Sequence, residues 1–471
     1  MIKFSDIQKK WPDYNEAEKG EIKQKLQEEL SQTRKKIIVL DDDPTGTQTV
    51  HDIPVYTDWS AESMKSGVNV QERMFFVLTN SRAFSEEKTT EVHKEIAGNI
   101  LSAVNDFILI SRGDSTLRGH YPLETQVLYD SLTAGGLHLN GEIIFPFFPE
   151  GGRFTLEKIH YVRYGDDLIP AGETEFAKDK TFGYQASSLT EWVQEKTSGK
   201  YPAESVLHIG LSELRARDYD SITQKLCAVQ NFGKITVDSL TYEDVQVFAI
   251  AYYRALRKGK NFLIRSAAAL VRILGGVTAK PVLEKEDLQA ADNPNGGVVI
   301  IGSHVKMTTA QLAELRKKED MVFIEMNQHL AVDEIAFEQE VQRVIRETND
   351  CIGKGKSVAC FTRRERFDID TGDKEDELRL AGKISEKLTS VVAKLEHKPS
   401  FIIAKGGITS SDVATIGLGI KKAMVMGQIL PGVPVWFTGS ESKFPGMPYV
   451  IFPGNVGSET ALLDAVNKFM E

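Results

Sequence analysis

Three adjacent aspartates, residues 41–43, follow the apolar run IIVL (37–40) and precede the turn sequence PTG. Carboxylates this close repel one another when ionised, so a metal ion, a bound cation or a substrate proton should offset the repulsion. The end of a buried strand is a rigid and exposed place from which such groups can reach a ligand. The spacing therefore predicts a chemical site directly after residue 40.

A second polar cluster follows the apolar run FILI (107–110), in the stretch SRGDSTLRGH. Arg112 and Arg118 carry guanidinium groups that bind a carboxylate or phosphate through two hydrogen bonds. Ser115 and Thr116 offer hydroxyls that bond to sugar hydroxyls, and Asp114 offers a carboxylate that accepts a proton. The alternative is a structural aspartate–arginine ion pair at the start of a helix, and the sequence leaves both interpretations open.

A polar loop at residues 163–179, RYGDDLIPAGETEFAKD, contains Glu173, Thr174 and Asp179. Side chains of these types either contact a ligand or bond to the backbone of their own loop. Without other information, the pattern favours capping of the loop.

Three glycine-rich turns occur in the last third of the chain, each between an apolar run and an expected helix. They read GSHVKMTTAQL from residue 302, GGITSSDV from residue 406 and PGNVGSET from residue 453. Glycines let a backbone approach a phosphate closely, and the amides of a helix start point at it. None of the turns has the P-loop or the GxGxxG pattern. One such turn is most often only a helix start, but three together predict a nucleotide or other phosphate site.

Short apolar runs alternate with longer amphipathic segments along most of the chain. This alternation predicts an α/β fold with mostly parallel sheets that are covered by helices on both faces. The first series of expected strands is 37–40, 74–78, 107–110, 142–148, 234–237 and 261–264. The second series begins at 297 and continues through MVFIEM, KSVACFT, FIIAKGG, KKAMVMG and YVIFPGN.

We therefore expect two α/β domains, each a mostly parallel sheet flanked by helices. Residues 1–35 are expected to form a charged helical extension, 36–275 a substrate-binding domain, 276–296 a polar linker and 297–471 a nucleotide-binding domain. Ligands in such folds bind at the carboxyl ends of the strands, so we expect the active site in the cleft between the domains.

The composition is that of an ordinary globular protein, with 41% hydrophobic and 26% charged residues. A net charge of −10 argues against a nucleic-acid backbone as the main partner. The widely spaced Cys227, Cys351 and Cys360 form neither a disulfide framework nor a CxxC metal motif, which favours a cytoplasmic setting. No signal-peptide pattern occurs at the start, and no run approaches the roughly 18 apolar residues of a membrane span.

The aspartates admit one specific interpretation from a short motif. Asp41-x-Asp43-x-Thr45 after an apolar strand is similar to the DxDx[TV] pattern of haloacid-dehalogenase-type phosphatases. That resemblance implies Asp41 as the nucleophile and Asp43 as the acid/base, with a bridging Mg²⁺. It leaves the glycine-rich turns of residues 297–460 without a role.

The combined motifs resemble those of the four-carbon acid sugar kinases, a family long described as a domain of unknown function. The DDLTG turn of that family reads DDPTG at 42–46, its (K)xDSTLRG turn reads RGDSTLRG at 112–119, and its P-x-x-E-T-x-x-x-x-D loop lies at 170–179. Its GS, GGET and PGNFG turns read GS at 302–303, GGIT at 406–409 and PGNVG at 453–457. The resemblance spans about residues 36–465. Pro44, Arg112 and Ile408 depart from the usual Leu, Lys and Glu, which indicates a divergent member.

This resemblance implies an ATP-dependent kinase that phosphorylates the terminal hydroxyl of a small sugar acid such as threonate, erythronate or a 3-oxo-tetronate. The implied base is Asp43, with Asp114 as the second candidate. The implied substrate contacts are Asp42, Thr45, Gly46, Arg112, Ser115, Thr116, Arg118, Glu173 and Thr174. The implied ATP contacts, mostly through backbone, are Ser303, Gly406, Gly407, Ile408, Thr409, Gly454, Asn455 and Gly457. Mg²⁺ is expected with ATP, and Asp42 is its candidate protein ligand.

A non-catalytic ligand-sensing protein with the same two binding sites is the remaining alternative. We expect a small-molecule substrate, no nucleic-acid or membrane partner, and a homodimer as the default assembly. The carbon number and stereochemistry of the substrate stay open.

Overall fold

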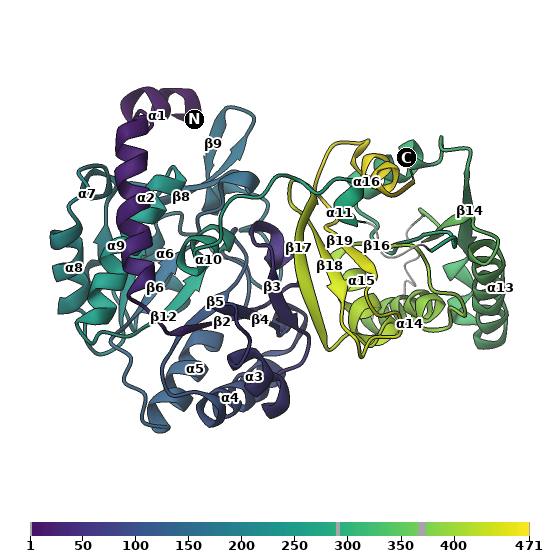
Figure 1. Cartoon of the computed structure of the whole chain (residues 1–471), viewed down its shortest axis with the longest axis horizontal. Helices are drawn as coiled ribbons and strands as arrows, with labels where there is room; N and C mark the ends of the chain where they lie inside the picture. The colour runs from purple at the N-terminus through teal and green to yellow at the C-terminus, as the bar shows by residue number, and fades with distance from the viewer. Residues whose placement is uncertain (1, 289–292, 366–373, 471) are drawn as a thin grey trace. The chain divides into compact units, whose positions relative to one another are not determined.

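The structure is a computed structural model that describes residues 2–288, 293–365 and 374–470. The chain divides into two compact units. The first comprises the chain up to Thr49 together with Asp58–Ala279, and the second comprises Val50–Thr57 together with the chain from Lys280. Each unit combines a layer of strands with helices on its faces, so the predicted α/β class is confirmed (Figure 1).

The strands of the first unit are all parallel within its main sheet. Their spatial order is β10 (Leu207–Ile209), β11 (Gly233–Val237), β6 (Gly141–Phe145), β12 (Phe262–Ser266), β5 (Phe107–Arg112), β2 (Lys36–Asp41) and β4 (Met74–Leu78). The strands β4, β5 and β6 are buried along their whole length, which explains why they read as continuous apolar runs rather than as alternating patterns.

Helices cover both faces of this sheet (Figure 1). One face carries α3 (Ala61–Val68), α4 (Glu86–Ala103) and α5 (Leu123–Ala134), which pack on one another. On the other face, α9 (Tyr242–Arg257) packs against α2 (Glu16–Ser31), α8 (Tyr219–Ala228), α7 (Leu211–Arg215) and α10 (Ala268–Gly275). A small antiparallel sheet adds β1 (Ile2–Lys3), β9 (Asp167–Pro170), β8 (Ile159–Tyr164) and β7 (Arg153–Leu156), and α1 (Phe4–Lys10) and α6 (Leu189–Lys196) complete the unit.

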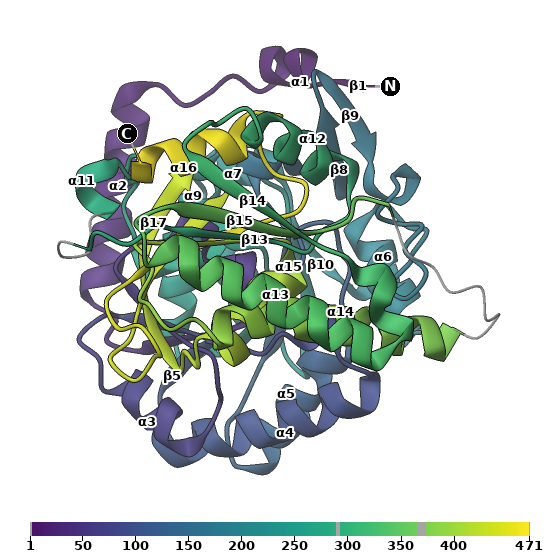
Figure 2. The same ribbon diagram turned by 90° about the vertical axis from the view of Figure 1, so that its right-hand side faces the viewer.

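The second unit has a mixed sheet. Its order is β3 (Ile53–Tyr56), β17 (Lys422–Leu430), β18 (Val433–Thr438), β19 (Pro448–Phe452), β16 (Ile402–Lys405), β13 (Val298–Ile301), β15 (Ser357–Thr362) and β14 (Met321–Met326). The pairs from β3 to β19 are antiparallel and those from β19 to β14 are parallel. Figure 2 shows α12 (Lys306–Leu315) and α16 (Ala461–Met470) on one face, with α13 (Glu334–Ile352) and α14 (Lys374–Ala393) on the other.

The strand β3 places residues 50–57 in the second unit, although we expected them in the first domain. Val55 and Ile53 are buried, and β3 pairs antiparallel with β17 from Tyr56↔Lys422 to Ile53↔Val425. Backbone hydrogen bonds at both ends complete the ladder, from Asp52 N to the carbonyl of Val425 at 2.6 Å and from Thr57 N to that of Lys421 at 3.1 Å. The chain therefore leaves the first unit for one strand and then returns.

The expected linker is also different in the structure. Leu283 and Leu288, the latter in α11 (Lys285–Leu288), are fully buried in the apolar core of the second unit. The amide of Leu283 donates to the carbonyl of Gln428 at 2.7 Å. Although this stretch is polar overall, two of its residues are therefore part of the core of the second unit. Residues 289–292 lie outside the described chain.

Within residues 2–35, α1 and α2 are helices while Ile2–Lys3 form the strand β1, and α2 packs against α9 in the first unit. Ile22 and Leu26 of α2 are buried. Glu29, also on α2, forms ion pairs with Arg254 and Arg257 of α9. None of the described helices combines the length and apolarity that crossing a membrane requires.

Candidate functional site

Charged side chains gather at the carboxyl ends of β2, β4, β5 and β12, which are neighbours in the first unit's sheet. Asp41 on β2 is in register with Arg112 on β5 and with Leu78 on β4. Arg112 is in turn in register with Ser266 on β12. The residues that follow these positions therefore leave the sheet along one edge, where such folds bind ligands.

Asp41 is the enclosed member of the aspartate triplet. Its side chain is 2% exposed, and Oδ1 accepts a hydrogen bond from Arg112 Nη1 at 3.2 Å. Oδ2 has no partner, and a Cβ on Gly46 would lie 1.8 Å from it. Burial and the neighbouring charges of Asp42 and Asp43 raise the pKa of Asp41 to about 7, against the opposing effect of Arg112. A carboxylate that is this enclosed is poorly placed to attack a substrate phosphate as the nucleophile of a phosphatase does.

Arg82 joins the other two aspartates, and the sequence analysis did not identify it. It lies in the short 3₁₀ helix η2 (Ser81–Ala83) after β4. Nη2 and Nε donate to Asp42 Oδ1 and Oδ2 at 2.6 and 3.2 Å, and Nη1 donates to Asp43 Oδ2 at 3.3 Å. The cation that three adjacent carboxylates require is thus supplied largely by the protein itself.

Asp43 is the most open carboxylate of the triplet, with a side chain 20% exposed against 2% for Asp42. Thr45 donates to Asp43 Oδ1 from its amide at 2.8 Å and from its hydroxyl at 2.6 Å. Burial disfavours the charge on both aspartates, and it raises the pKa of Asp42 even beside Arg82. For Asp43, Arg82 and Thr45 overcome burial and lower the pKa. Asp43 is therefore ionised and partly open.

The turn after β5 is organised around Asp114. Its Oδ2 accepts hydrogen bonds from Arg118 Nε at 2.7 Å and from the hydroxyl of Thr116. Asp179 Oδ2 lies 3.8 Å from Arg118 Nη1. Burial is outweighed by Arg82 and Arg118, so the pKa of Asp114 lies well below its ordinary value. The aspartate–arginine ion pair that the sequence allowed is present, beside the aspartate triplet.

A buried ion pair lies beneath this turn, and neither partner was predicted. Arg265 of β12 donates from Nη1 to Glu124 Oε2 at 3.2 Å and from Nη2 to the carbonyl of Arg118 at 3.3 Å. Ser81 donates to the other oxygen of Glu124 at 2.5 Å. A Cβ on Gly113 would lie 2.0 Å from Arg265 Nη1, so the turn needs glycine there. These contacts tie the loops after β4 and β5 to one support.

Of the remaining predicted residues of the first unit, Ser115 and Thr174 make contacts within the protein. Ser115 is 8% exposed, and its carbonyl accepts from His160 Nε2 at 2.8 Å. The Thr174 hydroxyl donates to the carbonyl of Ala171 at 2.7 Å, while Glu173 is exposed. The loop therefore shows the capping that the sequence favoured.

The described residues contain no group of three or more His, Cys, Asp or Glu that could hold a metal ion. Both oxygens of Asp42 accept from Arg82, so Asp42 is ion-paired and does not fit the expected role of magnesium ligand. A magnesium ion bound to ATP would arrive as part of the substrate.

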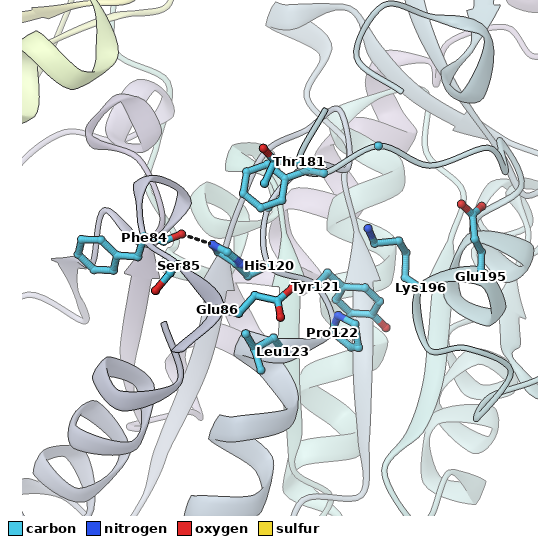
Figure 3. Close-up of a pocket in the computed structure, with 13 residues that line it drawn as sticks. Phe84, Ser85, Glu86, His120, Tyr121, Pro122, Leu123, Thr181, Glu195 and Lys196 are labelled. Atoms are coloured by element: carbon cyan, nitrogen blue, oxygen red, sulfur yellow. Dashed lines mark hydrogen bonds between the residues drawn. The ribbon is translucent and has the colours of Figure 1, made fainter. Parts of the chain in front are cut away.

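The first unit also contains a cavity of about 470 Å³, lined by residues 84–86, 119–123, 181–183 and 195–196. Figure 3 shows His120 hydrogen-bonded to the carbonyl of Phe84, at 3.0 Å between Nε2 and O. Neither Asp43 nor Asp114 lines this cavity. One lining residue, Gly119, nevertheless adjoins the charged cluster, because a Cβ on Gly119 would lie 3.2 Å from Asp42 Oδ2.

In the second unit, the three glycine-rich turns follow β13, β16 and β19, which are adjacent parallel strands. A Cβ on Gly302 would lie 2.3 Å from Thr409 Oγ1. A Cβ on Gly406, which has φ +120°, would lie 3.1 Å from Ser303 Cβ, and one on Gly454 would lie 3.2 Å from Ser303 Oγ. The glycines allow the three turns to converge on Ser303.

Two residues outside the predicted set support this convergence. Thr308 of α12 bonds through its hydroxyl to Ser303 Oγ at 3.2 Å and to the carbonyl of Gly454 at 3.1 Å. Arg364, which follows β15, donates from Nη2 to the carbonyl of Ser303 at 2.6 Å. The side chain of Ile408 is 65% exposed.

Lys405 is the last residue of β16, directly before the GGIT turn, and the sequence analysis passed over it. Its side chain is fully buried, and Nζ donates to the carbonyls of Pro453 at 2.5 Å and Gly454 at 3.2 Å. Within the described chain no carboxylate forms an ion pair with it, and burial lowers the pKa of Lys405 to about 7. A buried amine beside three glycine-rich turns, without a counter-charge, suits an anionic ligand.

Comparison with known proteins agrees with this division. The sequence model of a sugar-binding N-terminal domain matches residues 37–274, and that of a nucleotide-binding C-terminal domain matches residues 298–462. No curated protein matches the chain.

Two solved structures share the fold. A Haemophilus influenzae protein of the DUF1537 family is 18% identical over 92% of this chain and 100% of its own, with a TM-score of 0.63. A Salmonella typhimurium LT2 protein, provisionally described as a tRNA synthase, is 16% identical over 91% of this chain and 98% of its own, with a TM-score of 0.67. With its sugar-binding and nucleotide-binding domains in this order, the chain belongs to the four-carbon acid sugar kinase family.

Proposed function

We propose that this protein is an ATP-dependent kinase that phosphorylates a hydroxyl of a small sugar acid of about four carbons. The proposal rests on one observation, which is that each unit contains a different kind of candidate binding site. The sugar-binding unit holds an ionised, partly open carboxylate, Asp43, among guanidinium groups. The nucleotide-binding unit holds converging glycine-rich turns around the buried Lys405.

In the sugar-binding unit, Asp43 orients the attacking hydroxyl and accepts its proton. Its pKa is lowered, so it is a weak base that is always ionised at neutral pH. Phosphoryl transfer depends mainly on positioning and on electrostatic stabilisation, so a weak base suffices. Asp114 is the second candidate, but Arg118 and Thr116 already occupy one of its oxygens.

In the nucleotide-binding unit, the turns at Gly302–Ser303, Gly406–Thr409 and Gly454–Gly457 offer backbone amides to the phosphates of ATP. Gly407, Ile408 and Asn455 take part through their backbone in this assignment. The phosphates of ATP favour the protonated form of Lys405, and the resulting ammonium group stabilises their negative charge. Magnesium enters with ATP and neutralises charge on the phosphoryl group that is transferred.

The test is ADP release by the purified protein with Mg-ATP and a panel of acids: D- and L-threonate, D-erythronate, 3-oxo-tetronates and five-carbon acids. We expect ADP formation that depends on one acid. Replacing the proposed base in Asp43→Asn should lower kcat by about 10²–10⁴-fold, whereas Asp13→Asn, at an exposed aspartate in the first unit, should not.

Two results would contradict the proposal. Phosphate release from sugar phosphates without ATP, abolished in Asp41→Asn, would indicate a phosphatase. Binding of ATP and acid with no turnover in the unmodified protein would indicate a ligand sensor.

A further inference from the structure

We propose that Arg153, together with Arg118, binds the carboxylate of the sugar-acid substrate. This inference rests on the proposed function and names the residue that selects an acid over a neutral sugar. Arg153 is the first residue of β7, in the small antiparallel sheet, and its side chain is partly buried. No motif of the sequence pointed to it.

Arg153 and Arg118 lie against the same aromatic ring. The guanidinium carbon of Arg118 is 5.1 Å from the centre of the Phe176 ring, and that of Arg153 is 5.4 Å from it. Phe176 belongs to the loop that contains Asp179, which also approaches Arg118. Two cations held beside one ring repel each other, and an anion between them would relieve that repulsion.

The two arginines differ in their counter-charges. Arg118 is paired with Asp114 and approached by Asp179. Among the described residues, no carboxylate lies within ion-pair distance of Arg153, and its Nε is buried without a hydrogen-bond partner. Nη1 donates to the carbonyl of Gly151, while the nearby carboxylate of Glu175 accepts from Tyr164 at 2.7 Å.

A partly buried guanidinium with a buried, unpartnered donor and no counter-ion is unfavourable unless a ligand supplies the charge. Burial lowers the pKa of Arg153 and Arg118 adds to this, whereas Asp114 acts in the opposite direction. A carboxylate is a planar acceptor that a guanidinium can bind through two hydrogen bonds. The unmatched charge and the free Nε therefore fit a small organic acid.

Arg112 and Arg118 were both candidates for this role from the sequence, and Arg153 is a better candidate than Arg112. Arg112 is 6% exposed, with Nη1 at 3.2 Å from Asp41 and 3.8 Å from Asp42. Its charge is already matched inside the protein. Arg153 is the guanidinium of this cluster that lacks such a match.

The experiment compares Arg153→Gln with Arg163→Gln in the full-length protein. Arg163 is a matched control, because it is an exposed arginine on the adjacent strand β8 that also lies over a ring, with its guanidinium carbon 4.1 Å from the centre of Phe4. We expect Arg153→Gln to raise KM for the acid about 10- to 100-fold, with KM for Mg-ATP changed less than about twofold. Preference for the acid over its uncharged carboxamide should fall by a similar factor.

Calorimetric titration with the same acid, without nucleotide, separates this inference from the proposed function. If the unmodified protein binds the acid and Arg153→Gln does not, the inference holds even if no ADP forms. If ADP forms but Arg153→Gln behaves as Arg163→Gln does, the inference is wrong and the kinase proposal stands. If the unmodified protein binds acid and carboxamide equally, the inference is wrong whether or not any variant folds.

Discussion

At the scale of residues, the two units differ in buried charge: the first contains clustered carboxylates, and the second contains a lysine without a carboxylate partner among the described residues. In the first unit, three adjacent carboxylates are held together by Arg82 and Arg112. In the second, the buried Lys405 bonds to two carbonyls and lies over the ring of Phe452, but no carboxylate within the described chain pairs with it. The first site is therefore largely neutralised before a ligand arrives, whereas the second needs a negatively charged ligand.

Nucleotide binding should therefore change the protonation of Lys405. With a pKa of about 7 in the free protein, Lys405 is mostly neutral at pH 8.5. Phosphate groups beside Nζ favour the ammonium form, so Mg-ATP binding at pH 8.5 should take up about one proton per chain. Calorimetry in two buffers of different ionisation enthalpy measures this number.

The matched variants are Lys405→Met and Lys421→Met, the latter at an exposed lysine of the same unit. Uptake should disappear only in Lys405→Met, and equal uptake in both would contradict the assignment. The same lowered pKa means that Lys405 destabilises the free fold progressively as the pH falls from its ordinary pKa of 10.5 towards 7.

At the scale of elements, the amino-terminal helices are structural parts of the sugar-binding unit. The α2 helix begins with a capping box, in which Asn15 and Glu18 satisfy each other's backbone amides. Its side chains Ile22 and Leu26 are buried and Glu29 pairs with two arginines of α9, whereas its other charged residues are exposed or half-buried. An element that looks like a charged extension in the sequence is thus the outer layer of an α/β unit.

Ile22→Ala should lower the free energy of unfolding by about 2–5 kcal/mol, because it leaves a cavity where a fully buried side chain packs. Lys23→Ala, next to it on the exposed side of α2, should change stability by less than about 0.5 kcal/mol. Urea denaturation followed by circular dichroism measures both. Similar values for the two variants would mean that α2 is not part of the cooperative unit.

At the scale of the whole molecule, neither unit is one continuous segment. The chain passes from the first unit to the second after Thr49, returns after Thr57 and passes again after Ala279. The sheet of the second unit therefore depends on β3, whose sequence lies inside the first half of the chain. Without β3, the strand β17 would present an unpaired apolar edge, and such edges promote aggregation.

A fragment of residues 280–471 should accordingly be less stable than the same fragment fused to residues 50–57. We expect the fusion to melt higher by at least about 4 °C, equivalent to about 1–2 kcal/mol, and to remain monodisperse. A fusion with the same eight residues in scrambled order is the control. Equal melting temperatures for the native and scrambled fusions would show that β3 contributes nothing to this unit.

The sequence by itself determined the α/β class and many of the turns that form the two sites. Asp43, Arg118 and Gly406 were found because each lies in a loop directly after a continuous apolar run, and that pattern is local in the chain. A weaker local signal existed for Arg265 and Lys405, which follow the runs 261–264 and 401–404 without interruption. The roles of these two residues could not be read from that position.

Only the tertiary structure decided which charges meet. Arg82 lies about 40 residues from Asp42 in sequence, and they pair because the loops after β2 and β4 leave the sheet side by side. Arg112 forms an ion pair with Asp41 because β2 and β5 are neighbouring strands. Arg153 has no carboxylate partner among the described residues, and its buried Nε makes no hydrogen bond. A hydrophobic pattern depends on a few neighbouring residues, so it can be read from the sequence. Ion pairs, and the place of β3 in the second unit, depend on contacts between segments that are far apart in the chain.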